Sequence, residues 1–171
     1  HNRTGKSNIN PGDERYWPLY PEVAHIPFLI AAPGLEGGRT VGALLQPADI
    51  LPTLLDLAGI DVAPPQPFHG QSFAPMLRGE SQSPLHEYVI SASFLRLEDG
   101  SVPAEWVTPV VYTERWAYVP IGADGERELY DLQADPYAEA NVISEYPGVA
   151  DDLHGKLLAW LQGVEAPEEA I

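Results

Sequence analysis

The sequence contains no cysteine among its 171 residues. This absence excludes disulfide bonds, thiolate zinc sites and a cysteine nucleophile from the chain, and it leaves the redox compartment undecided. No apolar run approaches the roughly 18 residues of a membrane helix, so no membrane span is predicted. Basic residues are scarce: the chain has nine Lys and Arg residues and 25 Asp and Glu residues, which gives a formal net charge of -16. We therefore do not expect nucleic acid or an anionic membrane surface as a partner.

Enough apolar material is present for a folded core. The hydrophobic fraction is 44%, which excludes wholesale disorder. The length suits one domain, or one domain with part of another. The chain begins at His1, without a starting Met or a signal peptide, and its first segment is loop-like. We therefore expect a piece of a longer protein whose own targeting signal is not visible.

The first half of the chain has the pattern of an α/β fragment. Residues 1–24 are rich in proline and glycine and are expected to be irregular. The apolar run 26–32 predicts a buried strand covered on both faces. The stretch "ADILPTLLDLAGI" predicts a helix with Asp49 as N-cap and Gly59 as its C-terminal stop. Its predicted apolar stripe consists of Ile50, Leu51, Leu54, Leu55 and Ala58.

The second half changes to strands after a proline-rich connector, residues 61–84, that holds one helical turn near 73–77. The segments "EYVISASF", "PVVYTERWAYVP" and "ERELYDL" predict strands. In the middle segment, taken as one strand, one face carries Val110, Tyr112, Trp116 and Tyr118. A helix is predicted from about 149 to 161. This half is therefore an α+β layer: an antiparallel sheet of three or four strands with one helix on its apolar face.

The stretch "RELYDLQADPYAEANVISEYP", residues 127–147, places Asp131 and Asp135 around a bend. Two acids this close can hold a metal, form a catalytic pair, or accept backbone N–H bonds at a corner. Asp135 is followed by proline, a strong turn opener, and Asn141 can accept N–H bonds at the next bend. Nothing nearby offers the third ligand that calcium or zinc normally needs. We interpret the corner as architecture.

The phrase "ELYDLQADPYAEANV" nevertheless resembles a segment near the C-terminus of the sulfatase family. The usual form there is E-L-Y-D-L, a few residues, D-P, an acidic residue and Asn. Four more blocks are similar to sulfatase segments and occur in the family's order: "LYPEVAHIPFLIAAPG", "LLQPADILPTLLDLAGI", "FHGQSFAPMLRGE" and "VVYTERWAYVP". Together the five blocks cover most of residues 20–161. Five blocks in order are much more specific than one.

The resemblance implies a fold and a division into domains. Sulfatases resemble alkaline phosphatase, with a large α/β domain of mixed sheet that carries the active site and a smaller C-terminal domain. Residues 1–67 would then form the end of the catalytic α/β domain and residues 68–84 a connector. Residues 85–171 would form the C-terminal subdomain, an antiparallel sheet with a terminal helix.

The resemblance also implies an activity, sulfuric ester hydrolysis, for the complete protein. In the family, a Cys or Ser in C/S-x-P-x-R becomes formylglycine, and a divalent cation, usually calcium, polarises the sulfate. This chain has no such motif, so we expect it to be inactive alone, with the nucleophile and most metal ligands upstream. The implied substrate is a sulfated small molecule or a sulfated glycan. A periplasmic or extracellular location follows only if a signal peptide lies upstream, and the oligomeric state is undetermined.

Two rival functions stay open at this point. A phosphonate or phosphate ester hydrolase of the same superfamily uses a similar scaffold. A non-catalytic binding module is the other rival; it predicts that residues 85–165 fold alone and that Lys6 can be replaced without effect.

Five residues are candidates for the site. "TGK" resembles the end of the family's metal loop, which makes Lys6 a sulfate ligand or, alternatively, a solvated loop lysine. His1 would lie beside the metal ligands or be one of them. Trp17 and Tyr20 are hypothesised to line the substrate cleft. His25 is expected at the rim of the pocket, where it packs or forms hydrogen bonds.

Overall fold

The structure is a computed structural model that describes residues 18–63, 67–92, 108–122 and 125–166. The chain divides into two compact units. The sheet unit comprises His1–Ile26 and Ile90–Ile171, and the helical unit comprises Pro27–Val89. Among the helices that the structure describes, none has the length and apolar character needed to cross a bilayer.

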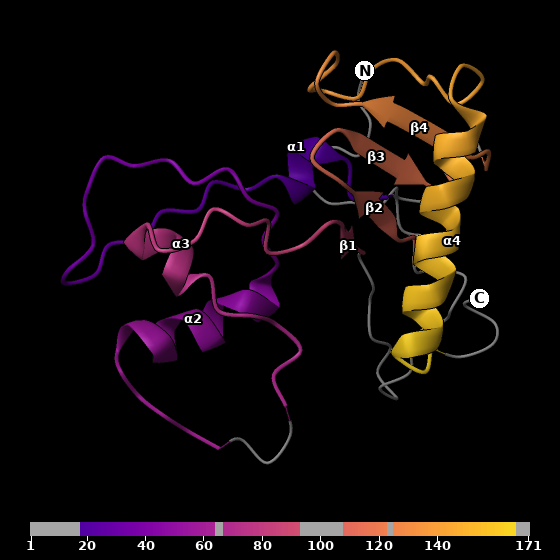
Figure 1. Cartoon of the computed structure of the whole chain (residues 1–171). Helices are drawn as coiled ribbons and strands as arrows, with labels where there is room; N and C mark the ends of the chain where they lie inside the picture. Colours follow the sequence, from indigo (N-terminus) through magenta and orange to yellow (C-terminus); the bar gives the residue numbers. More distant parts are fainter. Residues whose placement is uncertain (1–17, 64–66, 93–107, 123–124, 167–171) are drawn as a thin grey trace, which may run out of the picture. The chain divides into compact units, whose positions relative to one another are not determined.

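A small antiparallel sheet and one long helix dominate the sheet unit (Figure 1). The elements are β1 (Val89–Ser91), β2 (Val110–Tyr112), β3 (Trp116–Val119), β4 (Glu128–Asp131) and α4 (Pro147–Gly163). The strand order is β1-β2-β3-β4, and β3 pairs antiparallel with both β2 and β4. The predicted sheet with one terminal helix is confirmed.

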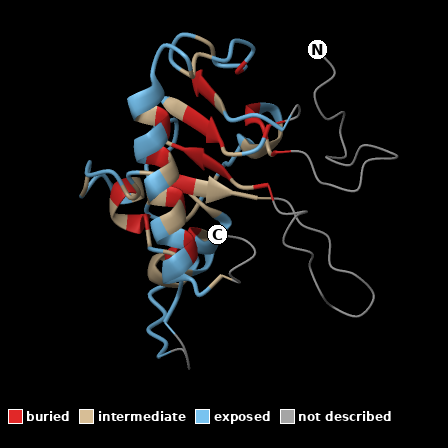
Figure 2. Ribbon diagram, turned by 90° about the vertical axis from the view of Figure 1, so that its right-hand side faces the viewer, coloured by how far each residue is buried: buried red, intermediate tan, exposed pale blue. Residues whose placement is uncertain are grey.

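Part of the core of this unit lies between the sheet and α4, and both faces of the sheet are covered, because consecutive residues of β2, β3 and β4 are buried. Buried positions concentrate on the strands and on one side of the helix, whose other side is exposed (Figure 2). The buried helix residues recur three to four positions apart and are Ala150, Leu153, Leu157 and Leu161. The helix starts at Pro147, two residues before the predicted start, at a position where a missing N–H costs nothing.

The segment "PVVYTERWAYVP" is a hairpin, so its interpretation as one strand is wrong. Thr113 closes a tight turn: its N–H donates to the carbonyl of Trp116 at 2.8 Å, and its Oγ1 accepts the N–H of Trp116 at 2.8 Å. In the resulting register Tyr112 faces Ala117. Apolar residues alternate in the same way along a strand and across a hairpin with an odd-numbered turn. Without Gly or Pro at the bend, the periodicity alone could not reveal it.

The helical unit contains the 3-10 helix η1 (Pro47–Asp49), which continues into α2 (Ile50–Leu57), and α3 (Ala74–Arg78). Both predicted helical segments are confirmed, and Gly59 follows α2 with φ 65°, as a C-terminal stop requires. Asp49 immediately precedes α2, at the position predicted for the N-cap, but its side chain forms no capping hydrogen bond with that helix. Helical structure begins at Pro47 with Gln46 as the N-cap, and the Asp49 side chain reaches back to the Gln46 N–H.

The strand predicted at 26–32 does not form. Most of its side chains are exposed, above all Leu29 at 90%. A buried parallel strand needs strands beside it to pair with, and no described strand pairs with these residues. The apolar stripe of α2 is likewise uncovered, since Leu51 is 54% exposed and the one buried residue of α2 is Thr53. The described part of this unit therefore exposes apolar side chains both near Leu29 and along α2.

Candidate functional site

The corner after β4 uses its acidic side chains to hold the backbone. Asp135 Oδ2 accepts the N–H groups of Glu139 at 2.6 Å and Ala140 at 2.8 Å. Asn141 Oδ1 accepts the N–H of Leu129 in β4 at 3.1 Å, which ties the loop to the sheet. The interpretation of this corner as architecture is confirmed, because turn and loop N–H groups occupy these side-chain oxygens.

Asp131, at the end of β4, forms an ion pair with Arg115 from the β2–β3 turn. The guanidinium donates from Nη2 at 2.7 Å and from Nε at 3.1 Å to Asp131 Oδ2. These hydrogen bonds hold the pKa of Asp131 below its ordinary value. The same guanidinium stacks 4.5 Å above the Trp116 ring, whose centroid lies 5.1 Å from that of Tyr146. Arg115 therefore stabilises the sheet.

A second polar cluster joins α4 to the sheet. Arg127 Nε donates to the Tyr118 hydroxyl oxygen at 2.8 Å, and this oxygen lies 3.1 Å from His154 Nδ1 on α4. Arg127 Nη2 also contacts the Asp151 carboxylate at 3.2 Å. Burial raises the pKa of Tyr118, and the Arg127 hydrogen bond opposes this change. The cluster fixes the helix laterally on β3.

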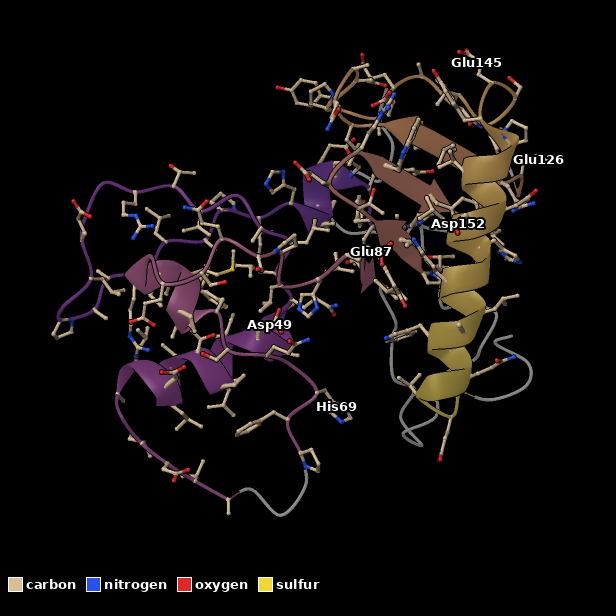
Figure 3. The ribbon with its side chains drawn as sticks, viewed as in Figure 1. Asp49, His69, Glu87, Glu126, Glu145 and Asp152 are labelled. Atoms are coloured by element: carbon tan, nitrogen blue, oxygen red, sulfur yellow. The ribbon has the colours of Figure 1, made fainter. Side chains whose placement is uncertain are left out.

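In the helical unit, Asp49 organises three separate segments and lies at the N-terminal end of α2 (Figure 3). Its side chain is fully buried. Oδ2 accepts the Gln46 N–H at 2.7 Å and contacts His86 Nε2 at 2.9 Å, while Oδ1 accepts the Gln71 N–H at 2.8 Å. From the sequence, Asp49 was predicted only to cap a helix. The capping-box spacing pointed to Gln46, but no local pattern indicated the contacts 22 and 37 residues away.

Thr53 adds a second link between the blocks "DILPTLLD" and "GQSFAPMLR". Its hydroxyl donates to the Asp49 carbonyl at 2.6 Å, and its oxygen accepts the Phe73 N–H at 3.1 Å. Gly70 lies at the same junction, where an added Cβ would be 2.1 Å from the carbonyl oxygen of Ala48. Only glycine allows the two backbones to come this close.

Asp56 makes the third link. Its carboxylate accepts the Ser72 hydroxyl at 2.8 Å and pairs with Arg78 Nη2 at 2.9 Å. The Ser72 hydrogen bond first and the Arg78 hydrogen bond second hold the pKa of Asp56 below its ordinary value. Two blocks that the sequence analysis recognised separately therefore form one hydrogen-bonded unit. The serine, threonine and aspartate side chains in these blocks have a structural role.

Of the five residues predicted for the catalytic site, the structure describes two, Tyr20 and His25. His1, Lys6 and Trp17 lie outside the described residues. Tyr20 is 1% exposed, and its hydroxyl donates to Glu128 Oε2 at 2.7 Å. His25 is exposed and follows the short helix α1 (Pro21–Ala24). The substrate-contact roles of these residues stay predictions.

The described residues do not fit a divalent cation. No group of three or more His, Cys, Asp and Glu residues gathers anywhere in the ranges that the structure describes. The two acids at the corner after β4 are occupied by backbone N–H groups and by Arg115. No catalytic step can therefore be derived through a metal held by this part of the chain.

Comparison with known proteins extends the resemblance seen in the five blocks. The family model described as N-sulphoglucosamine sulphohydrolase, C-terminal, matches residues 12–163. The Delta 4,5-hexuronate-2-O-sulfatase of Bacteroides thetaiotaomicron is 37% identical over 144 residues, a match that covers 82% of this chain and 27% of that protein. Arylsulfatase K of Bos taurus is 32% identical over 146 residues, a match that covers 81% of this chain and 26% of that protein.

Solved structures agree in fold. A Bacteroides thetaiotaomicron crystal structure, provisionally described as a sulfatase, matches with a TM-score of 0.73 at 32% identity over 89% of this chain and 32% of that one. The phosphonate monoester hydrolase of Silicibacter pomeroyi matches with a TM-score of 0.61 at 26% identity, and the match covers 77% of this chain and 28% of that one. The chain spans about a quarter of the length of the curated relatives it matches. Because the family model matches most of its residues, the chain belongs to the sulfatase family and represents its C-terminal portion.

Proposed function

We propose that this chain is the C-terminal portion of an enzyme that hydrolyses sulfate esters. One observation carries the proposal: a family model for sulphohydrolase C-termini matches residues 12–163. The 37% identity to a hexuronate sulfatase supports the same reaction. The substrate class that this relative favours is a sulfated sugar, such as a 2-O-sulfated uronate at a chain end.

The described geometry supports a scaffolding contribution from this portion. We assign residues 1–67 to the end of a catalytic α/β domain, residues 68–84 to a connector that packs with α2 in one compact unit, and residues 85–171 to the C-terminal subdomain. The exposed apolar side chains near Leu29 and along α2 support this assignment, because they suit a sheet layer that continues beyond the chain. The side-chain ties among Asp49, Thr53 and Asp56 hold that edge in shape.

The chemistry itself belongs to residues outside the described ranges. We assign the formylglycine nucleophile and most ligands of a calcium ion to the sequence upstream of this chain. Lys6 is the proposed sulfate ligand and His1 lies beside the metal ligands, while Trp17, Tyr20 and His25 are proposed near the substrate. A signal peptide upstream would place the enzyme in the periplasm or outside the cell.

The rival within the superfamily has less support. Identity to the phosphonate monoester hydrolase is 26%, against 37% and 32% for the two sulfatase relatives. The rival of another class, a stand-alone binding module, stays open. Assays on the complete protein separate all three.

The test compares three substrates with the complete protein: an aryl sulfate, a Δ4,5-unsaturated 2-O-sulfated uronate and a phosphonate monoester. We expect sulfate release from at least one sulfate ester to exceed phosphonate cleavage. Faster phosphonate cleavage would establish the superfamily rival, and no hydrolysis of any substrate would favour the module. The 171-residue chain alone should release no sulfate, because it contains no cysteine and no C/S-x-P-x-R motif.

Lys6 offers a residue-level test in the complete protein. Replacing Lys6 by Ala should lower kcat/KM for a sulfate ester roughly a hundredfold, as expected for loss of a charged group on a developing anion. Lys156→Ala is the matched control, since Lys156 lies on α4 and pairs with Asp152 at 3.1 Å. Equal kinetics for the two variants would remove Lys6 from the site.

A further inference from the structure

The helical unit contains a cleft that the proposed function does not use. Its volume is about 250 Å³, and the residues that line it are Arg39, Thr40, Val41, Gly42, Met76, Ser81 and Gln82. At about 30 Å³ per water, it has room for about eight water molecules. A single charged group with part of one sugar ring fits this size, whereas an oligosaccharide does not.

Arg39 stands out among the cations of this acidic chain. Among the described residues, every other Lys or Arg pairs with a carboxylate within 3.2 Å: Arg78, Arg115, Arg127 and Lys156. Arg39 has no such pair in the described ranges, although the chain has 25 acids for nine bases. An arginine that keeps its charge without a carboxylate, at the wall of a cleft, is suited to an anionic ligand.

The guanidinium is held in place by the end of α3. Arg39 Nη1 donates to the carbonyl oxygen of Leu77 at 3.1 Å. It also lies against Gly79, which ends α3 with φ 77° and where an added Cβ would be 3.2 Å from Nη1. The Nη1 hydrogen bond therefore orients the Arg39 guanidinium. Among the described residues, no second acceptor takes up its remaining N–H groups, which can bind a ligand.

The other polar groups of the cleft are also donors. The Ser81 hydroxyl oxygen accepts the Ser83 N–H at 3.2 Å, so the hydroxyl proton remains to be donated elsewhere. Thr40 and Gln82, which also line the cleft, carry a hydroxyl and an amide in their side chains. Donors around a fixed guanidinium match an oxygen anion, which offers acceptors in several directions.

We propose that this cleft binds an oxyanion, either free sulfate or the sulfate group of an acidic sugar. Arg39 supplies the charge, and Ser81, Thr40 and Gln82 supply hydrogen bonds to the remaining oxygens. The site itself is argued from the cleft and from the charge of Arg39, whereas the choice of sulfate among oxyanions rests on the proposed function. If Arg39 only caps the C-terminal end of α3, no ligand binds.

The test follows backbone amide NMR signals of the full 171-residue chain during titration. The probes are sodium sulfate, a sulfated monosaccharide and the same sugar without sulfate, all at constant ionic strength. We expect saturable shifts at residues 39–42 and 81–82 with a sulfate-bearing probe and none with the unsulfated sugar. Tighter binding of the sulfated sugar identifies a sugar-borne sulfate as the ligand, and equal binding identifies the free ion. Shifts that are unsaturable, or that spread over the chain, would overturn the proposal.

Variants separate ligand binding from folding. Arg39→Gln should weaken sulfate binding about tenfold or more, since charge-assisted hydrogen bonds are lost. Ser81→Ala, which retains the Arg39 contact with α3, should weaken it several-fold. Lys156→Gln removes the same charge from the sheet unit and should leave binding unchanged. Unaltered binding in both cleft variants would contradict the proposed site.

Discussion

Replacing Asp49 by Asn tests the idea that one buried carboxylate holds the helical unit together. The two side chains have nearly the same shape, but the amide has one acceptor oxygen where the carboxylate has two. In the native structure both oxygens are used, Oδ1 by the Gln71 N–H and Oδ2 by the Gln46 N–H and His86. The amide NH2 must therefore face one of the two backbone N–H groups, whichever way it is turned.

The size of the effect follows from the loss of one acceptor oxygen. Either the Gln46 N–H or the Gln71 N–H loses its partner in a position where Asp49 is fully buried. A buried donor without a partner costs about 1–3 kcal/mol. His86 can adapt, because its Nε2 can accept a hydrogen bond from the amide when that nitrogen carries no proton. We therefore expect a loss of about 1–3 kcal/mol, from the backbone donor alone.

Amide hydrogen exchange measures this loss locally. A change of this size corresponds to exchange roughly 5- to 150-fold faster at the Gln46 and Gln71 amides, if opening of the unit limits exchange. Asp61→Asn is the matched control, because Asp61 is an exposed residue of the same unit. The fluorescence of Trp116 in the sheet unit should not change. Native protection at both amides in the Asn variant would refute the role assigned to Asp49.

Three further changes have expected outcomes. Leu129→Ala removes a fully buried side chain of β4, so urea unfolding followed by tryptophan fluorescence should show a loss of about 2–5 kcal/mol; a loss below the error of the measurement would contradict the assigned core. Gly70→Ala places a Cβ 2.1 Å from the Ala48 carbonyl oxygen, so hydrogen exchange should accelerate throughout the helical unit, and unchanged exchange would count against the close approach. The Arg115 hydrogen bond lowers the pKa of Asp131 in the folded protein. The stabilisation of the fold by this ion pair is therefore complete above pH 3.8, the ordinary pKa of Asp, and is lost as the pH falls through the lower folded-state pKa. Arg115→Gln should therefore be less stable than the parent at pH 7, with a gap that narrows in acid; a gap independent of pH would show that stacking, not charge, dominates.

Patterns that depend on neighbouring residues were predictable. The terminal helix could be read from the spacing of its buried leucines, with Pro147 at its start. The corner after β4 could be read from Asp135 and the following proline, because a side chain that accepts N–H groups four and five positions away acts within its own turn. Asp49 was different. Its partners at positions 71 and 86 are distant in sequence, and no periodicity marks them.

The sequence by itself determined the family, the antiparallel sheet with its helix, and the architectural use of the acidic corner. These follow from local chemistry and from five blocks in a fixed order. Only the tertiary structure decided that 113–115 is a turn, that 26–32 is not a strand, and that Asp49 joins three segments. The physical reason is common to all three. Strand pairing and the partners of a buried carboxylate depend on groups brought close by folding, and an apolar run becomes a strand only where other strands are present to pair with it.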